Sequence, residues 1–270
     1  MARWFRRSAD PEPSAPLDWE PLLRRRLPGY GQLDEGELAH LGELIQRFVH
    51  TNSWEHARGF VVTDEMKVVV AAQASLLVLE LGLEWLGDVS SIILHPSTIV
   101  LGGEHAGPVP GVRTDEPVAL LGEAHFRGPV LIAWDTARYQ AAHPRSGQNV
   151  VIHEFAHHLD MLSGMVDGTP PMDDEALRSR WIEVCTAEYA IANGFHTDTV
   201  LRDYAATDPG EFFAVAAEAF FTRPVAFRDA KPDLYGVLAE FLRQDPAARA
   251  ERPRRVPPTP VPRPDVGSTP

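Results

Sequence analysis

The 270-residue chain is long enough for one large domain or two small ones, and its 44% hydrophobic content can supply a core. Its formal net charge of −13 argues against a nucleic-acid backbone or an anionic membrane surface as a partner. Its one cysteine, Cys185, excludes an intramolecular disulfide, fits a reducing compartment, and is expected to be a small core residue.

The two ends of the chain are expected to be flexible tails. Residues 1–16 and the proline-rich residues 246–270 contain few large apolar groups, so neither segment can offset the entropy of ordering. The first segment has basic residues but no apolar stretch behind them, so no secretory signal is predicted and a cytoplasmic location is expected. Residues 17–245 should form the folded domain, with a helical part at about 17–88 and a second part at about 89–245.

The first half of the domain shows helical and then strand-like patterns. An amphipathic helix is predicted from Asp34, an N-cap residue, through Phe48, and a second helix from Glu65 to Leu81. The apolar run 68–86 contains Gln, Glu and Gly residues, so a membrane span is not expected. The stretches "SSIILHP" and "GPVLIAWD" predict strands, and residues 102–128 predict loops with one further strand.

The second half is predominantly helical. A helix is predicted after Gly147 through Met161, and another from Met172 to a stop near Asn193 and Gly194. The stretches "DPGEFFAVAAEAFFTRP" and "PDLYGVLAEFLRQD" predict a final helical pair. Helices, then a few strands, then helices again indicate an α+β fold that is mostly helical with a small mixed sheet.

The stretch "VVIHEFAHHLD", residues 150–160, carries the strongest chemical signal. His153 and His157 are four residues apart, so on a helix their imidazoles share one face and can reach one metal ion. Glu154 completes an H-E-x-x-H pattern, in which the glutamate is the proton-accepting base rather than a ligand. His158 points about 100° away from His157 on such a helix and is expected to be solvated.

A catalytic zinc also needs a third protein ligand. After His158 the sequence "LDMLSGMVDG" contains no histidine, which excludes the metzincin arrangement. A glutamate from a later helix is the alternative, and Glu211 and Glu218 lie two turns apart on one face of an otherwise apolar helix. One of them as the ligand and the other as a partner of a ligand imidazole would account for both.

The chain resembles the Mlc titration factor A family of bacterial zinc peptidases. The resemblance covers about residues 17–244 and includes "LELGLEWL", "GPVLIAWD", "NVVIHEFAHHLD", "YAATDPGEFFAV" and "FFTRP". It implies a zincin-like metallopeptidase domain of the gluzincin type, similar to the catalytic domain of anthrax lethal factor. The second part of the domain, residues 89–245, would then be the catalytic part.

The resemblance also implies roles for individual residues. His153, His157 and Glu211 would bind one zinc ion, with Glu154 as the catalytic base. Tyr204 would donate a hydrogen bond to the oxyanion of the tetrahedral intermediate, which is a form of transition-state stabilisation. Asp160 resembles a residue that supports the metal site, although a helix-end or surface role is a close alternative. With Glu211 as the ligand, the helix pattern leaves Glu218 as the partner of a ligand imidazole, with exposure at the surface as the alternative.

Two functions follow from these expectations. The first is hydrolysis of peptides, with aminopeptidase-like activity implied by the resemblance. The strand near Val130 to Trp134 would be an edge that pairs with the substrate backbone, with a core strand as the alternative. The second is regulatory binding, because members of the family are named for sequestering the transcriptional repressor Mlc, which controls glucose phosphotransferase genes. The partner would then be a protein and not DNA.

Overall fold

The structure is a computed structural model. It describes residues 5–7, 19–57, 59–87, 89, 91–97, 128–194 and 200–253, together with the backbone of short strands between residues 99 and 124. Most of the two expected tails, most of 102–128 and residues 195–199 lie outside the described residues.

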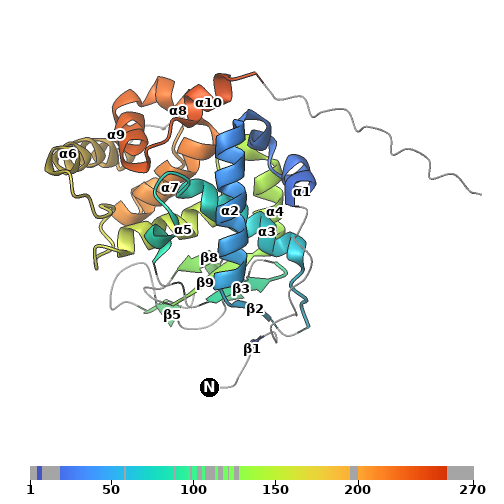
Figure 1. Cartoon of the computed structure of the whole chain (residues 1–270). Coiled ribbons are helices and arrows are strands. Elements are labelled where there is room, and N and C mark those ends of the chain that lie inside the picture. The colour runs from blue at the N-terminus through green and yellow to red at the C-terminus, as the bar shows by residue number, and fades with distance from the viewer. Residues whose placement is uncertain are drawn as a thin grey trace, which may run out of the picture.

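A five-stranded mixed sheet lies at one end of the molecule (Figure 1). Its order is β1 (Phe5–Arg7), β2 (Trp54–Ala57), β3 (Ser91–His95), β9 (Pro129–Ala133) and β8 (Gly122–Ala124). The three central strands are parallel, whereas the two outer strands pair antiparallel to them. The predicted strands "SSIILHP" and "GPVLIAWD" are confirmed as β3 and β9, and β3 is buried along its whole length.

The position of β9 contradicts its predicted role as the substrate-pairing edge. Leu131 is paired with Ile93 of β3 on one side and with Glu123 of β8 on the other, so both rows of backbone hydrogen-bonding groups are used. Trp134 is not in the strand but begins the next helix. The prediction for Val130 to Trp134 is therefore wrong, because an apolar run does not distinguish a central strand from an edge strand.

Two small hairpin sheets precede β8. They pair β4 (Ile99–Leu101) with β7 (Val118–Leu120) and β5 (His105–Ala106) with β6 (Arg113–Thr114). Residues 102–128 thus contain more strand than the one expected, since β5 to β8 all fall within this range.

The N-terminal helices pack above the sheet. They are α1 (Trp19–Arg26), α2 (Glu35–Thr51) and α3 (Asp64–Leu77), with the short 3-10 helices η1 (Pro28–Gln32) and η2 (Leu83–Leu86) between and after them. Asp34 caps α2 in a reciprocal capping box with Glu37, as its N-cap position predicts. Helix α3 ends four residues before the predicted end, and Val78 and Leu79 are buried in the turn that follows. The apolar sequence pattern extends past the end of α3 because these residues are buried, not because the helix continues.

The C-terminal half consists of helices. These are α4 (Trp134–Ala142), η3 (Pro144–Ser146), α5 (Val150–Met161), α6 (Glu175–Ala192), η4 (Asp203–Ala206), α7 (Pro209–Thr222), α8 (Pro224–Ala230), α9 (Pro232–Leu242) and α10 (Pro246–Glu251). The predictions of α5, α6, α7 and α9 are confirmed. Helix α10 corrects the predicted tail from residue 246: Pro246, Ala247 and Arg249 are buried.

The centre of the fold is the pair α5 and α7, which pack side by side with α3 against α5 (Figure 1). Fully buried aromatic rings fill this region, among them Phe155 of α5, Phe213 and Phe220 of α7 and Trp181 of α6. Among the described residues, no helix combines the length and apolar character that a membrane crossing requires. Cys185 is half-buried on α6 against this core.

Candidate metal centre

Helix α5 begins at a well-defined cap and is buried on nearly every side. The side chain of Asn149 accepts a hydrogen bond from the backbone N–H of Ile152, 3.1 Å away, which satisfies one free donor of the first turn. The apolar residues of α5 contact α3, α7 and strand β8. Polar side chains on such a helix are costly unless each has a partner.

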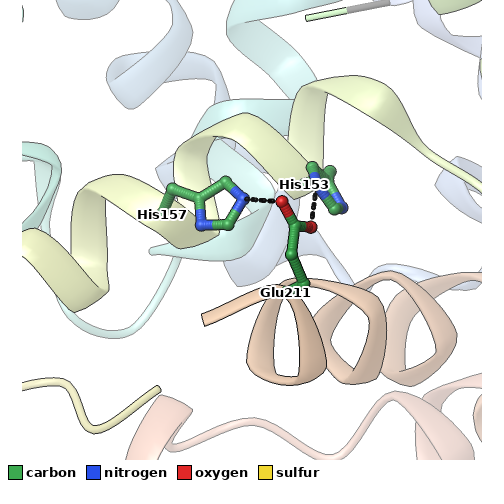
Figure 2. Close-up of side chains that lie close together, drawn as sticks. All are labelled: His153, His157 and Glu211. Atoms are coloured by element: carbon green, nitrogen blue, oxygen red, sulfur yellow. Dashed lines mark ion pairs between the residues drawn. The ribbon is translucent and has the colours of Figure 1, made fainter. Parts of the chain in front are cut away.

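His153, His157 and Glu211 converge in the space between α5 and α7. Figure 2 shows the carboxylate of Glu211 reaching from α7 between the two imidazoles of α5. Its two oxygens lie 3.0 Å from Nε2 of His153 and 3.6 Å from Nε2 of His157. One ligand atom from each residue falls within 4.8 Å of the others. Helix α7 places Glu211 in its first turn, where Asp208 caps the backbone N–H of Glu211 at 2.9 Å.

This donor set fits a zinc ion. Zinc prefers imidazole nitrogen and carboxylate oxygen, and two such atoms on one tetrahedral ion lie about 3.4 Å apart when each is about 2.1 Å from the metal. The 3.0 Å separation from His153 and the 3.6 Å separation from His157 end on different oxygens of Glu211, and both are close to that value. Three protein ligands would leave the fourth position for water or substrate, as in catalytic zinc sites.

Glu218 supports His153 from behind the cluster. It is 1% exposed, and its two oxygens accept hydrogen bonds from Nδ1 of His153 at 2.8 Å and from the backbone N–H of Asn149 at 2.6 Å. Because a carboxylate only accepts, the proton of the neutral imidazole is held at Nδ1 and the lone pair of Nε2 faces the cluster. The sequence left open whether Glu211 or Glu218 is the third ligand. In the structure these two glutamates lie on opposite sides of His153.

Arg202 is a residue that the sequence reasoning missed. Its guanidinium donates to Oε1 of Glu218 and lies over the ring of Tyr204, 4.9 Å from the centroid. The signal that could have found it is the buried Glu218, since a buried carboxylate needs a compensating charge. Arg202 thus connects the partner of His153 with the phenol beside the cluster.

Tyr204 stands at the rim of the cluster. It is 45% exposed, and its hydroxyl donates to Oε1 of Glu211 at 3.1 Å. Burial of the phenol and the adjacent Glu211 carboxylate raise the pKa of Tyr204 well above its usual value. The hydroxyl therefore stays protonated at neutral pH and remains a hydrogen-bond donor.

The charges of the site perturb the other pKa values. Burial raises the pKa of Glu154 to about 7, partly offset by the neighbouring His153 and His157. Burial opposes charge on His153 as well, but Glu211 and Glu218 outweigh it and raise the pKa of His153 to about 10. Burial likewise opposes charge on Glu211, yet the two imidazoles hold the pKa of Glu211 well below its usual range. The cluster thus favours positive charge between its members, and a metal cation would compete with the proton.

The remaining predicted residues are also buried. Asp160 is fully buried and accepts a hydrogen bond from the backbone N–H of Gly168 at 2.9 Å, so it is not a surface residue but anchors the loop after α5. His158 is 4% exposed and packs near the ring of Phe155, with 5.9 Å between centroids. The prediction that His158 is solvated is wrong, because α5 is enclosed on the face opposite the cluster too.

Comparison with known proteins places this chain in a family. The model of the glucose-regulated metallo-peptidase M90 family matches residues 1–243. The chain belongs to this family. It is 33% identical to an uncharacterized protein of Synechocystis over 86% of this chain and 85% of that one. It is 31% identical to Mlc titration factor A of Serratia proteamaculans, covering 93% of this chain and 96% of the relative. Mlc titration factor A of Klebsiella pneumoniae is 29% identical, with 92% and 94% covered.

Proposed function

We propose that this chain is a zinc-dependent, aminopeptidase-like peptidase of the cytoplasm. The observation that carries the proposal is the convergence of His153, His157 and Glu211 around one point, with Glu154 on the same helix turn as His153. Membership of a metallo-peptidase family supports the same reaction class. We propose residues 17–245, extended by α10, as the zincin-like peptidase domain.

In this proposal the protein groups divide the chemistry between them. His153, His157 and Glu211 would hold the ion, which supplies Lewis acidity for a carbonyl and lowers the pKa of a water molecule. Glu154 accepts the proton of the attacking water and passes it to the leaving amine.

Neighbouring side chains would stabilise the transition state, orient one proposed ligand and fix the loop after α5. Tyr204 donates its hydroxyl hydrogen to negative charge that develops on the substrate oxygen, a contact that is strongest in the transition state. For this the hydroxyl turns from Glu211, its present acceptor, toward the substrate. Glu218 keeps the Nε2 lone pair of His153 directed at the cluster, and Asp160 fixes the loop that follows α5.

The decisive experiment compares Glu154→Gln with the wild type. The variant should retain about one zinc per chain by elemental analysis and lose roughly 10²- to 10⁴-fold in kcat on a peptide substrate, because only the proton transfer is removed. The matched control is Glu183→Gln, an exposed glutamate of α6, which should leave both quantities unchanged. Full activity of a zinc-loaded Glu154→Gln protein would contradict the mechanism. Substrates with free and acetylated amino termini, compared on the wild type, test the aminopeptidase-like assignment.

A second candidate function is binding of an Mlc-type transcriptional repressor. It is favoured by relatives named Mlc titration factor A, which align over nine-tenths of this chain. Titration calorimetry with the purified repressor tests it, and Glu154→Gln separates the two functions. A repressor-binding protein should bind equally well with and without a working base. Absence of heat with both proteins at two temperatures, together with no co-elution of the repressor in size-exclusion chromatography, would exclude this function.

A further inference from the structure

A cavity lies beside the first turn of α5. It has a volume of about 590 Å³, within the usual range of small-molecule sites. Its walls come from η1, α3, α4, the first turn of α5, the junction of α7 with α8, and α10. None of the three cluster residues lines it, although Asn149 and Ile152 of α5 do. It is therefore separate from the proposed peptidase site.

The lining is apolar over most of its area but has a distinct charge. Among the described residues the wall contains arginines at 145, 223 and 249 and neither aspartate nor glutamate, although the whole chain carries a net charge of −13. Arg249 is neutralised by Glu37, 3.0 Å away. Arg145 and Arg223 have no carboxylate partner in the described part of the chain, so the cavity carries uncompensated positive charge.

Two polar atoms in the wall have unused hydrogen-bonding capacity. Gln73 is 1% exposed, and its amide donates to the carbonyl of Val69 at 2.9 Å while its Oε1 has no partner within the described residues. Nε of Arg223 is also buried without an acceptor there, although the same guanidinium donates to the carbonyl of Val200. Both atoms are enclosed by the wall, so the part of Arg223 that can meet a molecule in the cavity is the rest of its guanidinium.

We propose that this cavity binds a small amphipathic organic anion. Its apolar body would fill the space between α3, α4 and α8, and its anionic group would accept from the guanidinium of Arg223. A charge-assisted hydrogen bond to a guanidinium and burial of an apolar body together account for selection of such a molecule.

The test uses anilinonaphthalene sulfonate, a fluorescent anion with an apolar body and one N–H, and N-phenylnaphthylamine as its neutral analogue. The wild type should bind the anion at one saturable site, and the neutral analogue more weakly. Ala226→Trp, on the exposed rim of the cavity, should weaken anion binding at least about tenfold, whereas Ala230→Trp, one turn later on α8 and outside the cavity, should not.

A second pair of variants tests the charge. Arg223→Gln should weaken binding of the anion about tenfold and leave the neutral analogue unchanged, because one charge-assisted hydrogen bond is lost. Arg138→Gln, an exposed arginine of α4 outside the cavity, serves as its control. Absence of saturable binding, equal affinity for the two probes, or an unchanged affinity in Ala226→Trp would overturn the proposal. Binding is measured with and without zinc, so failure of the peptidase proposal would not affect the result.

Discussion

Replacing Glu218 with glutamine should weaken metal binding at the site, although none of the three proposed ligands is replaced. In the wild type this buried carboxylate accepts three hydrogen bonds, from the backbone N–H of Asn149, from Nδ1 of His153 and from Arg202. An amide has only one oxygen, so its NH₂ group must face either the N–H of Asn149 or the two donors on the other side. At least one buried donor then loses its acceptor, at a cost of about 1–3 kcal/mol in the free energy of unfolding.

The same change should weaken zinc binding by about 10- to 100-fold, since the orientation of His153 is no longer enforced. The assay is a competition titration of the zinc-loaded protein against a chelator, with chemical denaturation of the metal-free protein as the stability measurement. Glu240→Gln is the matched control, because Glu240 is an exposed glutamate of α9 that pairs with Arg180 at the surface. A folded Glu218→Gln protein that holds zinc as tightly as the wild type would refute the reasoning.

Three further predictions concern the surroundings of the cluster. Gly168→Ala should cost at least about 2 kcal/mol more in thermal denaturation than Gly164→Ala: both residues have positive φ, but only at Gly168 would the new Cβ meet backbone, 2.3 Å from a carbonyl oxygen. Tyr204→Phe should lower kcat about 10²-fold and leave KM nearly unchanged in steady-state kinetics. Burial raises the pKa of Asp160 to about 6, so the folded state binds this proton more tightly than the unfolded state does. The contribution of Asp160 to the free energy of unfolding therefore falls as the pH rises from about 4 to 6. Asp160→Asn should therefore gain about 1–3 kcal/mol relative to the wild type between pH 4 and pH 7 in urea titrations, and an unchanged difference would contradict this.

Local pattern was sufficient for much of the site. The spacing of His153 and His157 placed both imidazoles on one helix face, and the capping residue Asp34 marked the start of α2 correctly. Such signals succeed because they depend on residues within one or two turns, whose geometry the helix itself dictates. The apolar strands β3 and β9 were found for a similar reason.

The errors share a physical cause, which is that burial depends on neighbours distant in sequence. His158 was placed in solvent because it points about 100° away from His157 on the helix, whereas the fold encloses the whole helix. Strand β9 was read as an edge although β8 pairs with its outer side. A sequence pattern along one segment shows which of its faces are apolar. It does not show which other segment packs against each face.

The choice between Glu211 and Glu218 shows where local reasoning ends. Both carboxylates occupy the same face of α7, two turns apart, so periodicity alone treats them alike. The way α7 packs along α5 separates them, because it brings Glu211 to the Nε2 atoms of both histidines and Glu218 to Nδ1 of His153 alone. Two carboxylates of α7 thus contact the imidazole of His153 from opposite sides. The two helices cannot shift along each other without breaking both contacts. The packing of α5 against α7 therefore stabilises the core and aligns the proposed ligands through the same set of contacts.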